Sequence, residues 1–373
     1  MDLQLAIVIG LVVFFAVWIL LYQRKRRQEA QMGLDLETMI DKEDWQGVCR
    51  LLRRQLWLWG AVIAATGFVL VGRLMVGGSP LAPALMLAYF VYRYIPLVKS
   101  YRNAAYNRRV QGEEQEQRAA TEDTVRQFTT LIDCNYTILG SDCTDEKATA
   151  RYQETLERGR KEGFWPCIAY VDEILLDSMN IAIESNDGTE PTEPSLQILT
   201  QWREKQLHKP VGNGKAFLTE TLQEKKDFVD TQGEGWWQRD VIGEEVDADE
   251  VEAMSVLTQA SDTAVAVLLE IPVKEPWQIF AYLPYGGWNE CPETEQHMSV
   301  ARYWYEQYGA VPAAIGGDTV QYFLTRPFSA VNLEETALEH FAYCEDSISQ
   351  GYGSISAWKA ALPKSSYWFF WWD

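Results

Sequence analysis

The first hundred residues alternate between long apolar runs and short basic segments. Uncharged runs cover residues 5–22, 56–72 and 74–92, and each is 17 to 19 residues long. About 20 mostly apolar residues cross the hydrocarbon core of a bilayer as a helix. The pattern therefore predicts three membrane spans, at about residues 4–22, 55–76 and 81–98, with a tight turn at Gly77–Pro80 between the last two.

Each apolar run also has an alternative interpretation. The first run could be a cleaved signal peptide, but its basic residues, Arg24–Arg27, follow it instead of preceding it. A signal peptide carries its positive charges in front, so the order of charges favours a retained anchor. The other two runs could form a buried helical hairpin of a soluble domain. Their length and the basic residues that flank them favour membrane spans.

Basic residues predict the orientation of the spans. Residues 23–55 contain eight Lys or Arg residues and residues 99–109 contain four, whereas the turn between the second and third spans has only Arg73 nearby. Loops rich in Lys and Arg stay on the cytoplasmic side. We therefore expect a multi-pass protein of the inner (plasma) membrane with a cytoplasmic C-terminal body. Apolar residues at helical spacing in 36–52 indicate either an amphipathic helix beside the membrane or a partner-binding helix.

The remainder of the chain is patterned as a polar linker, residues 110–130, followed by a folded domain, residues 131–373. Strands are expected at 164–171, 264–273, 277–282, 311–315, 319–324 and 367–372, with helices between most of them. The last strand is apolar on both faces, which is typical of a strand inside a sheet covered on both sides. The fold class is therefore α/β: three N-terminal transmembrane helices in residues 1–109, then a mixed α/β cytoplasmic domain.

Charge separates these two parts of the chain. Residues 1–109 contain 14 basic and 7 acidic residues, whereas residues 110–373 contain 19 basic and 46 acidic residues. A strongly acidic body argues against nucleic-acid binding and favours a protein partner with a basic surface. The six cysteines all lie on the expected cytoplasmic side, so we expect free thiols.

Two pairs of Cys and His residues are the candidate metal ligands: Cys291 with His297, and His340 with Cys344. Thiolate and imidazole are the usual ligands of zinc, but this spacing matches no common zinc module, and buried residues without a ligand are the alternative. Cys291 is also a candidate catalytic nucleophile, because Pro292 looks like a first helical residue and a helix N-terminus stabilises a thiolate. His297 or His340 would then be its base.

Acidic and aromatic residues supply the other candidates. Asp346 is a candidate catalytic residue that could form a carboxylate pair with Asp373, although solvated helix caps are the alternative. Aromatic side chains are common at the centres of interfaces. Four tryptophans are therefore candidate interaction residues, with core packing as the alternative: Trp236, Trp237, Trp288 and Trp372. The chain has no phosphate-binding loop, nucleophile elbow or H-E-x-x-H motif.

The C-terminal sequence carries a family resemblance. Its motifs are Leu283–Pro292 (LPYGGWNECP), Arg302–Trp304 with Tyr308–Ala310, Tyr343–Asp346, and the terminal Trp368–Asp373 (WFFWWD). Together they resemble the bacterial domain-of-unknown-function family 4253, strongly over about 270–373 and more weakly over 145–180. The resemblance implies a bacterial protein with a compact α/β module and implies no reaction.

The sequence favours a membrane-tethered cytoplasmic protein-interaction or regulatory module. The expected partners are the membrane and a protein. The sequence indicates no cofactor and no established enzyme activity. The first alternative is an enzyme that uses the Cys and His candidates, either with zinc or through a thiol. The second alternative is an envelope-associated scaffold without a dedicated ligand.

Overall fold

The computed structural model describes residues 36–140, 143–187, 195–231, 233, 235–259, 261, 263–329 and 332–373. The chain divides into two compact units, residues 1–118 and residues 119–373. The first expected span, at about residues 4–22, lies outside the described residues.

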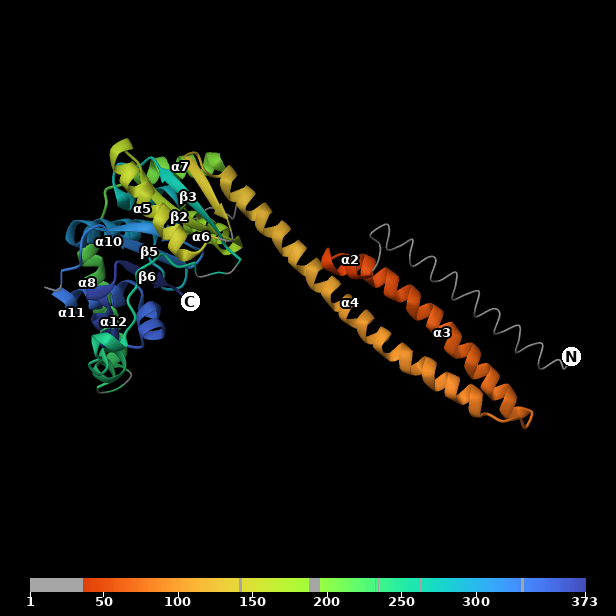
Figure 1. The fold of residues 1–373 in the computed structure, drawn as a ribbon. Coiled ribbons are helices and arrows are strands. Elements are labelled where there is room, and N and C mark those ends of the chain that lie inside the picture. The colour runs from red at the N-terminus through yellow and green to blue at the C-terminus, as the bar shows by residue number, and fades with distance from the viewer. Residues whose placement is uncertain are drawn as a thin grey trace. The chain divides into compact units, whose positions relative to one another are not determined.

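The described part of the first unit is a helical hairpin (Figure 1). A short helix, α2 (Leu36–Asp41), precedes α3 (Trp45–Met75), and residues 76–80 turn the chain into α4 (Leu81–Thr130). The Asp44 carboxylate caps α3, because it accepts a hydrogen bond from the Gly47 amide at 2.8 Å. Gly77 supplies the left-handed backbone of the turn with φ of 71°. The expected turn at Gly77–Pro80 is confirmed.

The helices α3 and α4 pack against each other where α3 begins. Val48, Cys49 and Leu52 of α3 form a small buried cluster with Ala104 of α4. The expected spans at 55–76 and 81–98 fall within these two helices, and both helices are long and apolar enough to cross a membrane. The expected amphipathic stripe at 36–52 is helical but divided: residues 36–41 form α2, and residues 45–52 form the start of α3, which continues without a break through the second apolar run.

The second unit is built on a six-stranded mixed sheet with the strand order β1-β3-β2-β4-β5-β6. Neighbouring strands are antiparallel except for β2 and β4, which are parallel. The strands are β1 (Asn135–Gly140), β2 (Trp165–Val171), β3 (Val265–Ile271), β4 (Ala310–Ile315), β5 (Thr319–Leu324) and β6 (Tyr367–Trp371). The expected mixed α/β fold is confirmed.

Helices cover both faces of this sheet (Figure 1). On one face, α5 packs Tyr152 and Leu156 against Ile168 and Ala266 of the central strands. The larger core lies on the other face, under the end of α4 and most of the remaining helices. These are α6 (Glu173–Asp187), α7 (Leu196–His208), α8 (Gly214–Asp230), α9 (Ile279–Tyr282), α10 (Thr294–Tyr308), α11 (Leu333–Tyr343) and α12 (Ile355–Ala361); α5 itself is Asp145–Glu162. Burial on both faces explains why β2 and β3 are almost continuously apolar.

Short one-turn or π-helical segments join these elements. They are η1 (Trp237–Ile242), η2 (Ala248–Glu250), η3 (Pro276–Gln278), η5 (Ser347–Tyr352) and η6 (Leu362–Lys364). Several local predictions are confirmed by the backbone. Gly163 ends α5 in the left-handed region with φ of 87°. The Asp172 carboxylate accepts from the Leu175 amide at 2.9 Å at the start of α6. Gly316 lies in the turn that joins the β4–β5 hairpin.

Two strand predictions need correction, and one strand was missed. Residues 277–282 are helical, in η3 and α9, because Pro276 starts the turn and Glu275 with Gln278 forms a capping box. The terminal strand β6 is an edge strand, and among the described residues it pairs only with β5. It is still apolar on both faces, because Tyr367 reaches the smaller core and Phe370 the larger one. The edge strand β1 was not predicted, since its side chains are mostly exposed.

Candidate functional site

The loop between α9 and α10, residues 283–293, folds around the ring of His297. Gly286 has φ of 95°, and a Cβ atom there would lie 1.8 Å from the Pro292 carbonyl oxygen and 2.8 Å from His297 Nε2. Only glycine fits this close approach. The Thr294 hydroxyl donates to the Tyr285 carbonyl oxygen at 2.8 Å and holds the loop on the first turn of α10.

A chain of polar contacts runs inward from this loop. Cys291 Sγ lies 3.4 Å from His297 Nε2. The other ring nitrogen, Nδ1, lies 2.5 Å from the Tyr343 hydroxyl on α11, which is 3.1 Å from the Tyr322 hydroxyl on β5. All four residues are buried. The structure therefore brings two of the sequence-predicted site residues, Cys291 and His297, into direct contact.

Burial sets the charge of this pair. It lowers the pKa of His297 to about 3 and raises the pKa of the Cys291 thiol well above its usual value. Both groups are therefore neutral at pH 7, whereas a thiol nucleophile needs a lowered pKa and access to solvent. Cys291 also lies outside the helix: α10 begins at Thr294 with Glu293 as its N-cap, so Pro292 is not its first residue.

The remaining metal candidates have other partners. His340 accepts at Nδ1 from the Trp358 indole at 2.9 Å and is fully buried among aromatic rings. Cys344 follows α11, and its Sγ lies 2.9 Å from the Trp371 carbonyl oxygen. Across the part of the chain that the structure describes, no three or more His, Cys, Asp and Glu residues form a group that could hold a metal ion. In this structure, Cys291, His297, His340 and Cys344 therefore do not form one ligand group.

The Asp346 carboxylate does meet Asp373, but through the backbone. Its Oδ2 atom accepts from the Asp373 amide at 3.0 Å, and its Oδ1 atom accepts from the Gln350 side chain at 2.8 Å. These contacts tie the end of β6 to the segment after α11. Asp346 therefore has a structural role as a hydrogen-bond acceptor.

The last third of the chain contains the 283–293 loop, the helices α10 and α11, and four of the six strands. Residues 267–373 match the family model of a domain of unknown function, DUF4253. This confirms the resemblance over about 270–373, and the His297 cluster lies inside the matched domain. No curated protein and no solved structure matches the chain.

The four candidate interaction tryptophans lie at different depths, three of them against the core of the DUF4253 domain or inside it. Trp236, just before η1, is 39% exposed. Trp237 and Trp288 are half-buried and pack their rings on Phe341 and Tyr285, with centroids 5.7 Å and 4.9 Å apart. Trp372 is 2% exposed. Trp236 is therefore the one tryptophan of the four that presents a large exposed surface.

Sequence reasoning did not identify Glu339, the most heavily hydrogen-bonded carboxylate of the DUF4253 domain. Its side chain is 4% exposed and accepts from Lys215 Nζ at 2.7 Å. It also accepts from the Tyr303 hydroxyl at 2.7 Å and from the Trp304 indole at 3.2 Å. Glu339 thus joins α8, α10 and α11. The available signal was an acidic residue directly before His340 and Phe341, in a helix segment whose buried residues are mostly apolar.

Proposed function

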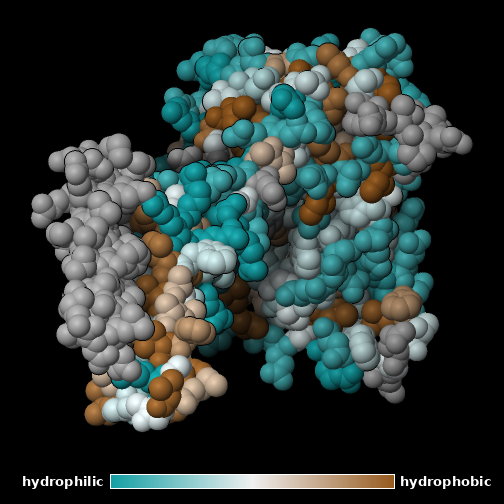
Figure 2. Space-filling view, turned by 90° about the vertical axis from the view of Figure 1, so that its right-hand side faces the viewer, coloured by the Kyte–Doolittle hydropathy of each residue, from teal (hydrophilic) through white to brown (hydrophobic). Residues whose placement is uncertain are grey.

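We propose that this chain is a membrane-tethered protein-interaction module, with the α3–α4 hairpin in the bilayer and the second unit in the cytoplasm. The outward-facing apolar surface of the hairpin carries the proposal. Phe68, Met75 and Leu81 are 82%, 83% and 66% exposed, and the most apolar stretch of either helix has no buried residue. Hydrophobic side chains, brown in Figure 2, lie along the visible part of the hairpin. A bilayer removes such a surface from water.

The basic residues of the hairpin support its orientation. Val48 packs on Ala104, so the start of α3 and the later part of α4 lie at the same end of the hairpin. That end carries a set of basic side chains, Arg50, Arg53, Arg54, Lys99, Arg102, Arg108 and Arg109. The turn at the other end has Arg73 alone nearby. Positive charge concentrated at one end favours a cytoplasmic location for that end.

The buried His297 cluster supports a binding role over the alternative of a thiol or zinc enzyme. The Cys291 thiol and the His297 ring are buried and contact each other and Tyr343 of α11. This arrangement packs the 283–293 loop, α10 and α11 together and leaves neither group open to a substrate. The excess of acidic residues in 110–373 favours a partner with a basic surface, since opposite charge steers association. We therefore assign binding, not catalysis, to this unit.

Membrane insertion is tested on the full chain by flotation and alkaline carbonate extraction. The wild-type chain should stay with the membrane after carbonate treatment. The double variant Phe68→Lys/Leu85→Lys should lose much of this association, because a charge costs about 3 kcal/mol at the centre of a span and still carries a cost nearer its ends. Phe228→Lys, at an equally exposed position of α8, is the matched control and should float like the wild type. Wild-type protein released by carbonate would contradict the tether.

Sidedness is tested with a thiol reagent that does not cross membranes. Cys134 and Cys143 are partly exposed in the second unit, so they should be labelled only after the inner membrane is permeabilised. The Cys134→Ser/Cys143→Ser variant is the control for specificity. Labelling of these two residues in intact cells would place the unit outside the cytoplasm.

Partner binding is tested by purification of the detergent-extracted full chain at low salt and at high salt. The acidic surface predicts a stoichiometric protein with a basic surface that is lost at high salt, because screening weakens contacts between exposed charges. Purification of the chain alone under both conditions would contradict binding to such a partner.

A further inference from the structure

The edge strand β1 lacks the features that usually protect a sheet edge. Among the described residues it pairs only with β3. Residues 135–140 contain no charged residue and no proline, and Tyr136 and Ile138 are 43% and 50% exposed. Natural proteins protect free edges with charges, prolines or covering segments. An unprotected edge of this kind is suited to pairing with another strand.

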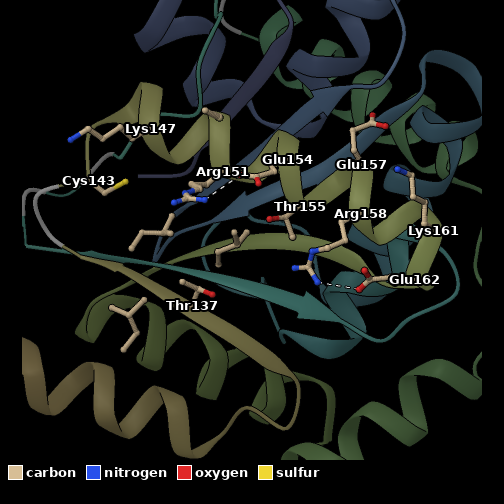
Figure 3. A pocket seen from close by; sticks show the side chains of 14 residues that line it. Thr137, Cys143, Lys147, Arg151, Glu154, Thr155, Glu157, Arg158, Lys161 and Glu162 are labelled. Atoms are coloured by element: carbon tan, nitrogen blue, oxygen red, sulfur yellow. Dashed lines mark hydrogen bonds and ion pairs between the residues drawn. The ribbon is translucent and has the colours of Figure 1, made fainter.

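The two faces of β1 differ. Tyr136 and Ile138 lie opposite Leu269 and Val267 of β3, on the face of the larger core. Thr137 lies opposite Leu268 on the other face, where an open groove of about 1050 Å³ separates β1 from α5. Figure 3 shows the side chains of α5 along this groove, with Thr137 on the strand across from them.

We propose that β1 binds β1 of a second copy of this chain, antiparallel, about a two-fold axis at Thr137. This register keeps the two faces of the sheet in line across the junction. It sets Tyr136 opposite Ile138 twice and Thr137 opposite its own counterpart. Aromatic and β-branched pairs of this kind stabilise antiparallel strands. The bulge between Ile138 and Gly140 lies outside these three central pairs.

Charge favours this edge as the contact between copies. Residues 110–373 carry an excess of 27 acidic residues, so most surfaces of two such units repel each other. Residues 135–140 themselves carry no charge. The neighbouring groove holds ion pairs within each copy: Arg151 contacts Glu154 at 3.2 Å and Arg158 contacts Glu162 at 3.1 Å (Figure 3), and Arg158 also contacts Glu270. The β1 edge therefore brings two copies together without placing unpaired like charges opposite each other.

One pair of short strands buries less surface than the interfaces of stable soluble dimers. Tethering raises the effective concentration of the copies and lets a small contact form. On this point the inference rests on the proposed membrane tether.

The test is disulfide cross-linking of the full chain in its membrane, in a Cys134→Ser/Cys143→Ser background. Thr137→Cys places two cysteines opposite each other on the axis, at a Cα separation of about 5 Å that suits a disulfide. A mild oxidant should produce a dimer of the 42.7 kDa chain. Asn135→Cys is the matched control, because its own counterpart lies four residues farther along the pair, about 13 Å away, and it should remain monomeric.

A second variant separates specific pairing from random collision. Ile138→Lys, added to Thr137→Cys, sets a lysine beside the partner's strand and should reduce the cross-linked fraction at least tenfold. Absence of the Thr137→Cys dimer, or equal cross-linking of Asn135→Cys, would overturn the proposal; the latter result would follow from collision or from another register. Flotation of the same samples reports the tether separately, so a monomeric chain that still floats contradicts only the β1 pairing.

Discussion

Arg203 donates from Nη1 to the Asp133 Oδ1 atom at 2.6 Å. Arg203 lies on α7 and is 5% exposed, whereas Asp133 lies in the short segment between α4 and β1. The same guanidinium donates to the carbonyl oxygens of Tyr282, at 3.0 Å, and Leu131, at 3.1 Å. One buried side chain of α7 therefore holds the segment that follows α4 against the end of α9.

Arg203→Ala should destabilise the second unit by about 3 kcal/mol, because it leaves the carbonyl groups of Leu131 and Tyr282 without this donor and removes the ion pair with Asp133. Urea unfolding followed by tryptophan fluorescence measures the change. Arg126→Ala removes an exposed ion pair with Asp123 and should change the unfolding free energy by less than about 1 kcal/mol. Equal effects of the two substitutions would show that the Arg203 contacts are not structural.

Gly286→Ala should be among the most destabilising single substitutions in the DUF4253 domain. The added methyl group would overlap the Pro292 carbonyl oxygen at 1.8 Å, and alanine is strained at φ of 95°. We expect a loss of about 4 kcal/mol or more in the free energy of unfolding. Gly351→Ala, which has no atom within 4 Å of the new methyl group, should stay within about 1 kcal/mol of the wild type. A tolerated alanine at position 286 would contradict the close approach of the loop to His297.

The buried histidine should make the stability fall below neutral pH. The pKa of His297 is lowered from 6.5 to about 3, so between these values the unfolded chain binds a proton that the folded chain excludes. Unfolding free energy should decrease as the pH falls from 6.5 towards 3, by about 1.4 kcal/mol per pH unit for this group. Burial lowers the pKa of His340 in the same direction.

Replacement of the His297 ring isolates its contribution to the pH dependence of the unfolding free energy. His297→Gln should reduce the slope of unfolding free energy against pH, measured between pH 6 and 4.5, by about 1.4 kcal/mol per pH unit. His208→Gln, a change at an exposed histidine of α7, is the matched control and should keep the wild-type slope. An unchanged slope in His297→Gln would mean that this imidazole is protonated in the folded protein.

Loss of the Glu339 carboxylate should loosen the packing of α8, α10 and α11. Glu339→Leu removes the acceptor of Tyr303, Trp304 and Lys215, of which Lys215 keeps its ion pair with Glu335. We expect a cost of about 2–3 kcal/mol. The exposed Glu334→Gln on the same helix should cost at most about 1 kcal/mol. In the Lys215→Met/Glu339→Leu double variant the loss should be smaller than the sum of the two single losses, and strictly additive losses would contradict the pairing.

Thiol reactivity distinguishes a structural Cys291 from a catalytic one. Because burial raises its pKa, Cys291 should react with a thiol reagent at pH 8 only after unfolding. Cys134 and Cys143 are partly exposed and should react first. Stopped-flow traces of the wild type and of Cys291→Ala should therefore share the same fast phase. A fast phase that disappears in Cys291→Ala would show that the Cys291 thiol is accessible and reactive, and would support the thiol-enzyme alternative.

Elements with a strong local signal could be predicted from the sequence. The end of α5 at Gly163, the cap of α6 at Asp172 and the hairpin around Gly316 depend on backbone preferences of single residues. The apolar runs that became α3 and α4 were visible because a continuous hydrophobic stretch needs no distant partner to be recognised. The family resemblance was carried by motifs of the same local kind.

Other elements needed information from distant parts of the chain. Residues 277–282 looked like a strand because they are apolar, yet the capping box at Glu275 and Gln278 makes them helical. The strand β1 has too little buried surface to show an apolar pattern. It is a strand because β3, 130 residues later, hydrogen-bonds to it.

The candidate site shows the same division between local and distant information. The sequence alone places Cys291 and His297 six residues apart and shows that residues 55–76 and 81–98 are apolar enough for two long helices. The fold as a whole sets the partners of His340 and Cys344, the burial of Trp372, and the hydrogen bonds that Glu339 of α11 accepts from α8 and α10. The physical reason is that periodicity records how each residue is buried, whereas contacts between distant segments depend on the packing of the whole fold.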